Sequence, residues 1–211
     1  FIPTYGDSQS QGFYLQNGGY YLGLSDHFDM QMRGDIYSNG SWALRDIMGY
    51  NNRYHYQGTF QISYADTRLP IAETANFSET HTFLINWQHS QDSKARPSST
   101  FMASVNAGSS NYLAYNSYNP NQFLQNTLQS NISFSKNFTT AITPIHLSLN
   151  GEHSQNTITK QIDINLPELT LSADRIYPYK MANGGKTGKS LADVLFDNLA
   201  VGFSANAANH L

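Results

Sequence analysis

The sequence predicts an all-β fold, an antiparallel meander of about twelve long strands. Three observations predict it: polar and apolar residues alternate with a period of two, turn-forming residues separate the alternating runs, and many runs are long. The runs reach about 9 to 13 residues, whereas globular strands average about 5 to 6 and tilted membrane-crossing strands need about 9 to 11. Run length is therefore closer to that of a membrane-spanning sheet.

The alternation is clearest over residues 28–36 and 54–64. One strand face would carry the apolar set Phe28, Met30, Met32, Ile36, Tyr54, Tyr56, Phe60, Ile62 and Tyr64. The opposite face would carry the polar set Asp29, Gln31, Arg33, Asp35, His55, Gln57 and Gln61. The same pattern recurs over residues 83–88, 128–135, 145–149, 158–164 and 199–203.

Turn signals divide the chain between these runs. Asn39-Gly40 predicts a two-residue hairpin, because such a turn needs positive φ at both central residues. Gly18-Gly19 predicts a bulge or bend within the second strand. Two segments are expected to be irregular, a Tyr- and Asn-rich linker over residues 111–125 and a Gly- and Lys-rich loop over residues 177–190. Residues 191–196 fit either a short helix or the start of a strand.

The chemistry of the two faces separates a barrel from a soluble domain. A soluble antiparallel domain would place aliphatic residues on its core face and Lys and Glu on its wet face. Here the polar face is mostly Gln, Asn, Ser, Thr and His, and the apolar face is rich in aromatic residues and Met. We therefore predict part of a transmembrane β-barrel, with the polar set facing a hydrated lumen and the apolar set facing lipid. A large soluble β-sandwich or β-helix remains the alternative.

Composition excludes several classes of function. The 211 residues contain 12 Lys+Arg and 15 Asp+Glu, with a net charge of −3 spread without blocks, so no nucleic-acid partner is expected. The absence of cysteine removes disulfides, thiol catalysis and Cys-based zinc sites. No run approaches the roughly 18 apolar residues of a helical membrane span.

No motif points to an enzyme. Residues 184–190 resemble a phosphate-binding loop, but Asn183 stands where that loop needs glycine, and no α/β context surrounds it. The seven histidines show no metal-ligand spacing, and no nucleophile elbow is present. We predict no catalytic residue, no metal site, no cofactor and no enzymatic activity.

Two features near the start of the chain would weaken strand pairing. Pro3 lacks the N–H that a ladder requires, and Gly18-Gly19 interrupts the next strand. An ordinary edge strand protected by proline is the alternative explanation.

Several segments, in their order along the chain, carry a family resemblance. They are residues 2–8, 12–21, 34–42, 86–92 and 175–180. Together they resemble the barrel domain of the LptD family, the lipopolysaccharide-assembly (organic solvent tolerance) proteins of the Gram-negative outer membrane. The resemblance spans most of the chain and depends on the order of the segments rather than on one diagnostic motif.

The resemblance implies that residues 1–211 are the N-terminal part of a large barrel of about 26 strands, without the periplasmic jellyroll and the remaining strands. It implies a translocon in the cell outer membrane that inserts lipopolysaccharide into the outer leaflet through the barrel lumen and a lateral gate. The implied partners are lipopolysaccharide, an LptE-type lipoprotein plug, the periplasmic lipopolysaccharide-transport bridge and outer-membrane lipid. A general porin or nutrient channel and a soluble carbohydrate-binding β-protein are the alternatives.

In that family the first and last strands form the lateral gate, which proline weakens. The resemblance places this gate at Ile2, Pro3, Thr4, Gly18 and Gly19. Pro3 matches the first-strand position, but glycine stands at the second, where it loosens a ladder and still donates its N–H. The cysteines that link the two domains in well-known members are also missing.

Overall fold

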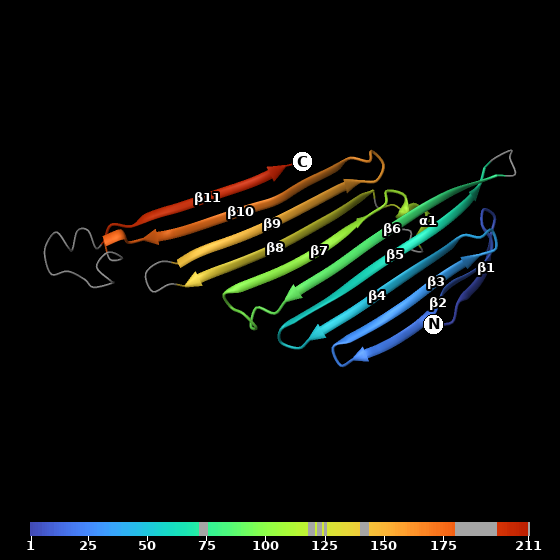
Figure 1. The fold of residues 1–211 in the computed structure, drawn as a ribbon, viewed down its shortest axis with the longest axis horizontal. Helices are drawn as coiled ribbons and strands as arrows, with labels where there is room; N and C mark the ends of the chain where they lie inside the picture. Colours follow the sequence, from blue (N-terminus) through green and yellow to red (C-terminus); the bar gives the residue numbers. More distant parts are fainter. Residues whose placement is uncertain are drawn as a thin grey trace.

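The structure, a computed structural model, forms one antiparallel sheet in which every strand pairs with the next along the chain. It describes residues 1–71, 76–117, 121, 124, 126–139, 144–179 and 198–210. Within these ranges the sheet has 11 strands in the order β1 to β11 (Figure 1). The predicted all-β meander is thus confirmed, with a strand number close to the one expected.

The strands are long, as the alternation predicts. Their bounds are β1 (Thr4–Ser8), β2 (Gly12–Ser25), β3 (Phe28–Tyr37), β4 (Trp42–Asn52), β5 (Tyr56–Pro70), β6 (Phe77–Gln91), β7 (Ser99–Gly108), β8 (Thr127–Thr139), β9 (Pro144–Asn156), β10 (Ile162–Ile176) and β11 (Val201–His210). Three of them have 15 residues each, which exceeds the usual length of globular strands, about 5 to 6 residues.

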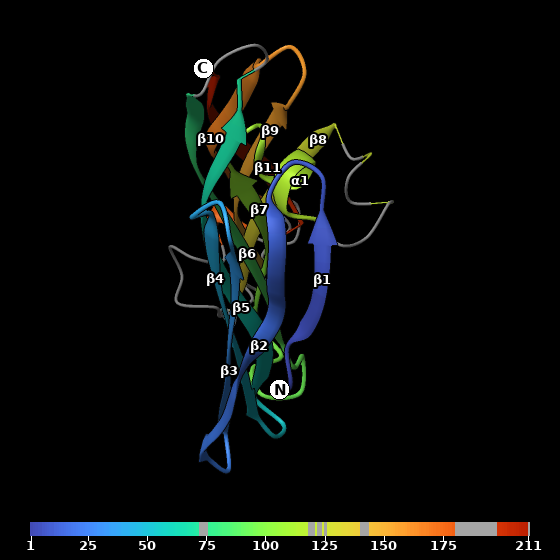
Figure 2. The same ribbon diagram turned by 90° about the vertical axis from the view of Figure 1, so that its right-hand side faces the viewer.

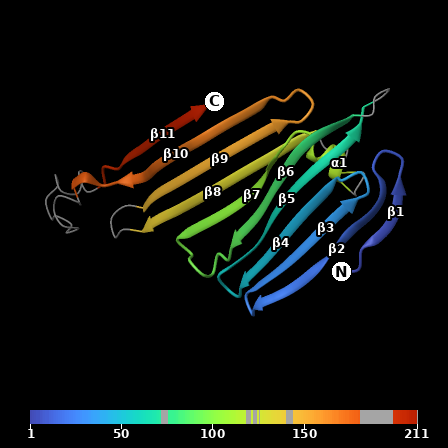
Figure 3. The same cartoon turned by 45° about the vertical axis from the view of Figure 1, so that its right-hand side comes forward.

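The sheet is open. β1 and β11 are its two outer strands, and they lie at opposite edges (Figure 3). In the described residues each of them pairs on one side only, β1 with β2 and β11 with β10. An open meander with two unpaired edges is the geometry expected of part of a barrel.

A short helix lies against one face of the sheet. α1 (Tyr112–Asn116) falls in the segment predicted to be an irregular linker, so that prediction was incomplete. Tyr112 and Leu113 are buried in a small cluster with Ala43, Ala65 and Leu84 of the sheet, and Leu128 completes it. Alanine at two sheet positions leaves room for the helix, which projects from one side in the nearly edge-on view of Figure 2. No helix in the described ranges has the length and apolarity needed to cross a membrane.

The β3–β4 hairpin differs from the predicted two-residue turn. The Tyr37 N–H donates to the Ser41 carbonyl at 3.0 Å, and the Gly40 N–H donates to the Tyr37 carbonyl at 3.1 Å. Of the two central residues named by the sequence, only Gly40 has positive φ, at 87°. The loop is therefore a three-residue turn closed by a glycine in the left-handed region, because one such residue suffices to bring the strands together.

Candidate functional site

One face of the sheet is polar across most of its width. We call it the polar face; it is the side on which α1 lies, and it presents Asp29, Gln31, Arg33 and Asp35 of β3 together with Gln57 and Gln61 of β5. Strand register joins these residues to polar residues on the next strands, because no shift interrupts β4–β5 or β5–β6. The predicted polar set therefore shares one face wherever it lies within strands.

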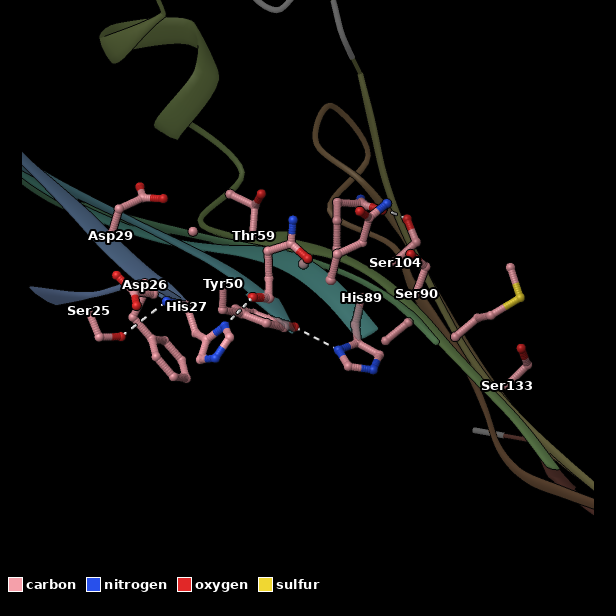
Figure 4. Close-up of a pocket in the computed structure, with 18 of the residues that line it drawn as sticks. Ser25, Asp26, His27, Asp29, Tyr50, Thr59, His89, Ser90, Ser104 and Ser133 are labelled. Atoms are coloured by element: carbon pink, nitrogen blue, oxygen red, sulfur yellow. Dashed lines mark hydrogen bonds between the residues drawn. The ribbon is translucent and has the colours of Figure 1, made fainter. Parts of the chain in front are cut away.

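The polar face is hollowed along one cross-strand row. Thr59 pairs with Gln88, Gln88 with Ser104, and Ser104 with Asn131, and these residues line a hollow of about 770 Å³. Figure 4 shows Asp29, Thr59 and Ser104 on one side of the sheet, and Tyr50 and His89 on the other. Amide and hydroxyl groups arranged in such a row can hydrogen-bond to hydroxyl-rich molecules without a charge to neutralise.

A glycine explains why the hollow exists beside Asp29. Gly49 lies between Asp29 and Thr59 in the same row and contributes no side chain to it. The Asp29 carboxylate leans over this glycine, since a Cβ at position 49 would lie 2.7 Å from Asp29 Oδ2. The glycine therefore makes room for the Asp29 carboxylate at the edge of the hollow.

Two members of the predicted sets lie outside the strands. Tyr54 and His55 occupy the turn between β4 and β5, and Tyr54 has a φ of 66°. The prediction that they alternate on two strand faces is therefore wrong, because period-two alternation applies only to extended backbone. Ile158 likewise lies in the turn before β10 rather than in a strand.

The opposite face, which we call the aromatic face, carries the rest of the predicted apolar set. Its members in β3 and β5 are Phe28, Met30, Met32, Ile36, Tyr56, Phe60, Ile62 and Tyr64. Several of them remain exposed, including Ile36 at 60% and Ile62 at 44%. Two carboxylates interrupt this face: Asp46 pairs with Met32 and Ile62, and Asp66 lies beside His81 near the ends of β5 and β6. Sequence alternation missed both.

A cluster of rings on the aromatic face satisfies its own polar groups. The Trp87 indole N–H donates to the Tyr50 hydroxyl at 2.8 Å, and that hydroxyl lies 2.8 Å from His89 Nδ1. Tyr50 reaches these partners by lying over Gly58 of the strand between, where a Cβ would overlap with its ring. Buried or lipid-exposed Tyr and Trp need such partners, so this cluster can stay in an apolar environment.

The residues assigned to a gate lie at the β1 edge. Ile2 is 95% exposed and precedes β1, Thr4 is the first residue of that strand, and Pro3 lies between them. Pro3 contacts the second strand at Gly18, where a Cβ would lie 3.0 Å from Cβ of Pro3. The Gly19 N–H donates to the Phe1 carbonyl at 3.1 Å. The structure thus brings the two sequence features together at one seam, which we call the β1–β2 seam (residues 1–8 and 12–19).

A bulge in β2 lies within this seam. The β2–β3 register shifts between Leu15 and Gly18, which leaves Gln16 and Asn17 opposite Asp35. Asn17 has a φ of 60°, the left-handed conformation that asparagine tolerates better than most residues. The sequence predicted a bulge at Gly18-Gly19, and the structure places it immediately before that pair. A side chain at Gly19 would overlap with the Met32 carbonyl, so the glycine permits close approach to β3.

Polar side chains on β3 hold the bulge in place. The Asn17 N–H donates to Asp35 Oδ1 at 2.6 Å, and Asp35 is only 5% exposed. Arg33 donates from Nη1 to Asn17 Oδ1 at 3.1 Å and from Nη2 to Gln31 Oε1 at 2.9 Å. The carboxylate therefore satisfies a backbone donor that the bulge removes from the ladder.

Sequence reasoning missed Gln16 and Asn17, although a signal for them exists. The apolar residues of β2 stand at odd positions before the bulge, Phe13 and Leu15, and at even positions after it, Tyr20 and Leu22. A one-residue insertion is needed to keep both sets on one face, because the side-chain period of a strand is two.

Three earlier interpretations fall outside the described residues. Residues 184–190, residues 191–196 and most of the predicted loop over 177–190 belong to the part of the chain that the structure does not describe. Among the described residues, no group of three or more His, Asp or Glu side chains is placed to hold a metal ion.

The comparisons with known proteins agree with the strand pattern. The family model described as "LptD protein" matches residues 1–211. No curated protein and no solved structure matched the chain at a significant level.

Proposed function

The chain belongs to the LptD protein family, which ties it to lipopolysaccharide transport, and we propose that it is the N-terminal part of an outer-membrane lipopolysaccharide translocon. In this proposal the aromatic face meets lipid, the polar face lines a hydrated passage for sugar headgroups, and β1 forms one side of a lateral gate. The chain acts as a transport component rather than as an enzyme. The observation that carries the gate assignment is the β1–β2 seam.

The chemistry of the cargo requires both faces and an opening. An amphiphile with acyl chains and a long saccharide needs a polar route for the saccharide and an exit to lipid for the chains. The polar face offers hydroxyl and amide groups along the row Thr59, Gln88, Ser104 and Asn131. The aromatic face offers exposed apolar side chains to the acyl phase.

The weak β1–β2 seam lets β1 move aside more easily, which lowers the cost of opening the gate at the outer edge of β1. Separating two strands in a bilayer exposes backbone donors and acceptors, each at a cost of several kcal/mol. β1 has only five residues, and Pro3 before it has no N–H to lose. A short strand preceded by proline therefore leaves fewer ladder bonds to break than a 15-residue strand such as β5 would.

We infer further partners from the same premise. An LptE-type lipoprotein would occupy the lumen against the polar face, and a periplasmic bridge would deliver the cargo. The two unpaired edges of the sheet support the need for further strands, since exposed edges pair with other chains or segments.

The test is the replacement Pro3→Ala in the full-length protein, with surface delivery of lipopolysaccharide as the measurement. Alanine restores an N–H donor at the edge, so the seam should hold more tightly and delivery should fall several-fold. Pro70→Ala is the matched control, because Pro70 ends β5 at a distance from the seam along the sheet. Unchanged delivery in Pro3→Ala, or an equal fall in both variants, would contradict the gate assignment.

A further inference from the structure

Arg33 is held beside the β1–β2 seam by neutral groups only. It pairs across strands with Gly19 on one side and with Arg45 on the other. Its hydrogen bonds go to the side-chain oxygens of Asn17 and Gln31, and its Cζ lies 4.0 Å from the centre of the Phe1 ring. Within the part of the chain that the structure describes, its Nε is buried and has no hydrogen-bond partner. Among the described residues, the contacts of this guanidinium are thus with neutral groups.

Positive charge is concentrated at this point of the polar face. Arg33 and Arg45 stand directly opposite each other, an arrangement of like charges that destabilises a sheet unless an anion neutralises it. Asp35 is the neighbouring carboxylate on β3, and it accepts the Asn17 N–H. The register therefore places two arginines on the same part of the polar face, close to Asp35.

The next strands contrast with this point. From β5 to β8, the polar face presents uncharged side chains, including Thr59, Gln61, Ser63, Asn86, Gln88, Ser104, Asn106, Asn131 and Ser133. A uniform lining for neutral sugars would need no arginine pair. The two arginines therefore distinguish this point from the uncharged wall formed by β5 to β8.

We propose that Arg33, together with Arg45, is a binding site for phosphate esters on the saccharide headgroup of the transported lipid. The proposal rests on the function proposed above and assigns one part of the cargo to one part of the wall. The planar guanidinium fork matches the geometry of phosphate oxygens, and charge-assisted hydrogen bonds of this kind are the strong ones.

The seam controls access to this site. The Phe1 ring lies against the Arg33 guanidinium, and the Phe1 carbonyl accepts the Gly19 N–H. Displacement of residues 1–3 from β2 would remove the ring from the guanidinium. A phosphate would then replace an aromatic contact, so the site becomes fully available as the seam opens.

The experiment measures binding of two lipids to the full-length protein in detergent. The probes are the diphosphorylated lipid A anchor of lipopolysaccharide and the same anchor after enzymatic removal of its phosphates. Arg33→Gln should weaken binding of the phosphorylated anchor roughly tenfold, the loss expected for a charge-assisted hydrogen bond. Binding of the dephosphorylated anchor should not change. Arg33→Lys keeps the charge without the planar guanidinium fork. Its affinity for the phosphorylated anchor should therefore lie between that of the wild type and that of Arg33→Gln.

Arg53→Gln is the matched control, because Arg53 is exposed in the β4–β5 turn, away from the seam. An equal effect of this control would show general charge attraction and overturn the site. If Arg33→Gln weakened binding of an anionic phospholipid as much as binding of the phosphorylated anchor, the assignment to the saccharide would be overturned. If the wild type bound the phosphorylated and the dephosphorylated anchor equally well, the site would be overturned and the proposed function would stand. If the wild type bound neither anchor, the proposed function would be overturned as well. Heat-modifiable migration of each variant checks that it folds.

Discussion

The first strands and the central strands of this sheet are paired in different ways. β5 and β6 pair without a register shift from Tyr56–Gln91 to Pro70–Phe77, and β4 pairs with β5 along its whole length. β1 has five residues, and the β2–β3 pairing shifts register twice. The same alternating chemistry thus gives a continuous ladder in one region and an interrupted one in the other. The difference comes from a few residues at the seam, so it can be altered by single substitutions.

Amide hydrogen exchange should show the largest difference between the two regions. Amides of Tyr5 and Gly6 in β1 should exchange through local opening, while those of Ile62 and Ser63 in β5 should need global unfolding. The opening free energies should differ by about 5 kcal/mol, since local openings range from near zero up to the global value. Mass spectrometry on the full-length protein in detergent measures this. Equal protection of β1 and β5 would remove the contrast.

Gly19→Ala should destabilise the bulged region where β2 pairs with β3. Its Cβ would overlap with the Met32 carbonyl, so β2 and β3 must separate, at about 3 kcal/mol of unfolding free energy. Gly23→Ala is the matched control in the same strand, because a Cβ there meets no atom within 4 Å. Urea unfolding of both variants tests the difference. A loss of similar size in both would mean that backbone freedom, rather than close approach to β3, explains Gly19.

Asp35→Ala should loosen the bulge by a different route. Removal of the carboxylate leaves the Asn17 N–H without its acceptor, which should cost about 2 kcal/mol of unfolding free energy. The control is Asp7→Ala, since Asp7 is exposed in β1. Asp35→Asn, which keeps an acceptor oxygen, should recover part of the loss. If Asp35→Ala unfolds like the wild type, the carboxylate does not hold the bulge.

Tyr50→Phe should give the smallest effect, and it acts on the central region. The hydroxyl accepts the Trp87 N–H and bonds to His89, so its loss should cost about 1 kcal/mol. Tyr20→Phe is a control on an exposed ring of β2. Thermal unfolding monitored by circular dichroism compares the two. An unchanged midpoint for Tyr50→Phe would show that water or headgroups replace the lost bond.

Much of this fold was predictable because alternation is a local property. The two faces of β3 followed directly from residues 28–36, and the same reasoning held for β5 from Tyr56 onward. It failed at Tyr54 and His55, where the backbone turns and period two no longer applies. It also overlooked Asp46 on the aromatic face, because a single polar residue among apolar ones carries little weight in a pattern.

The candidate seam was half visible in the sequence. Pro3 and Gly18-Gly19 could be named as weak points of two adjacent strands, since each residue type has its own backbone limits. Their contact depends on the register of β1 against β2, which turn length and the bulge determine together. The Arg33–Arg45 pair depends likewise on the register of β3 against β4, so no pattern within one strand could reveal it.

Residue types and their order were enough to predict the all-β class, the long strands, the two chemically distinct faces and the resemblance to the LptD family. These follow from backbone period and residue type, which act within a few residues of each other. The folded sheet was needed to reveal the bulge at Gln16 and Asn17, the helix packed on Ala43 and Ala65, and the grouping of Arg33 with Arg45 beside the seam. Those features require residues from different strands to meet, and the energy of pairing whole strands selects the register in which they do.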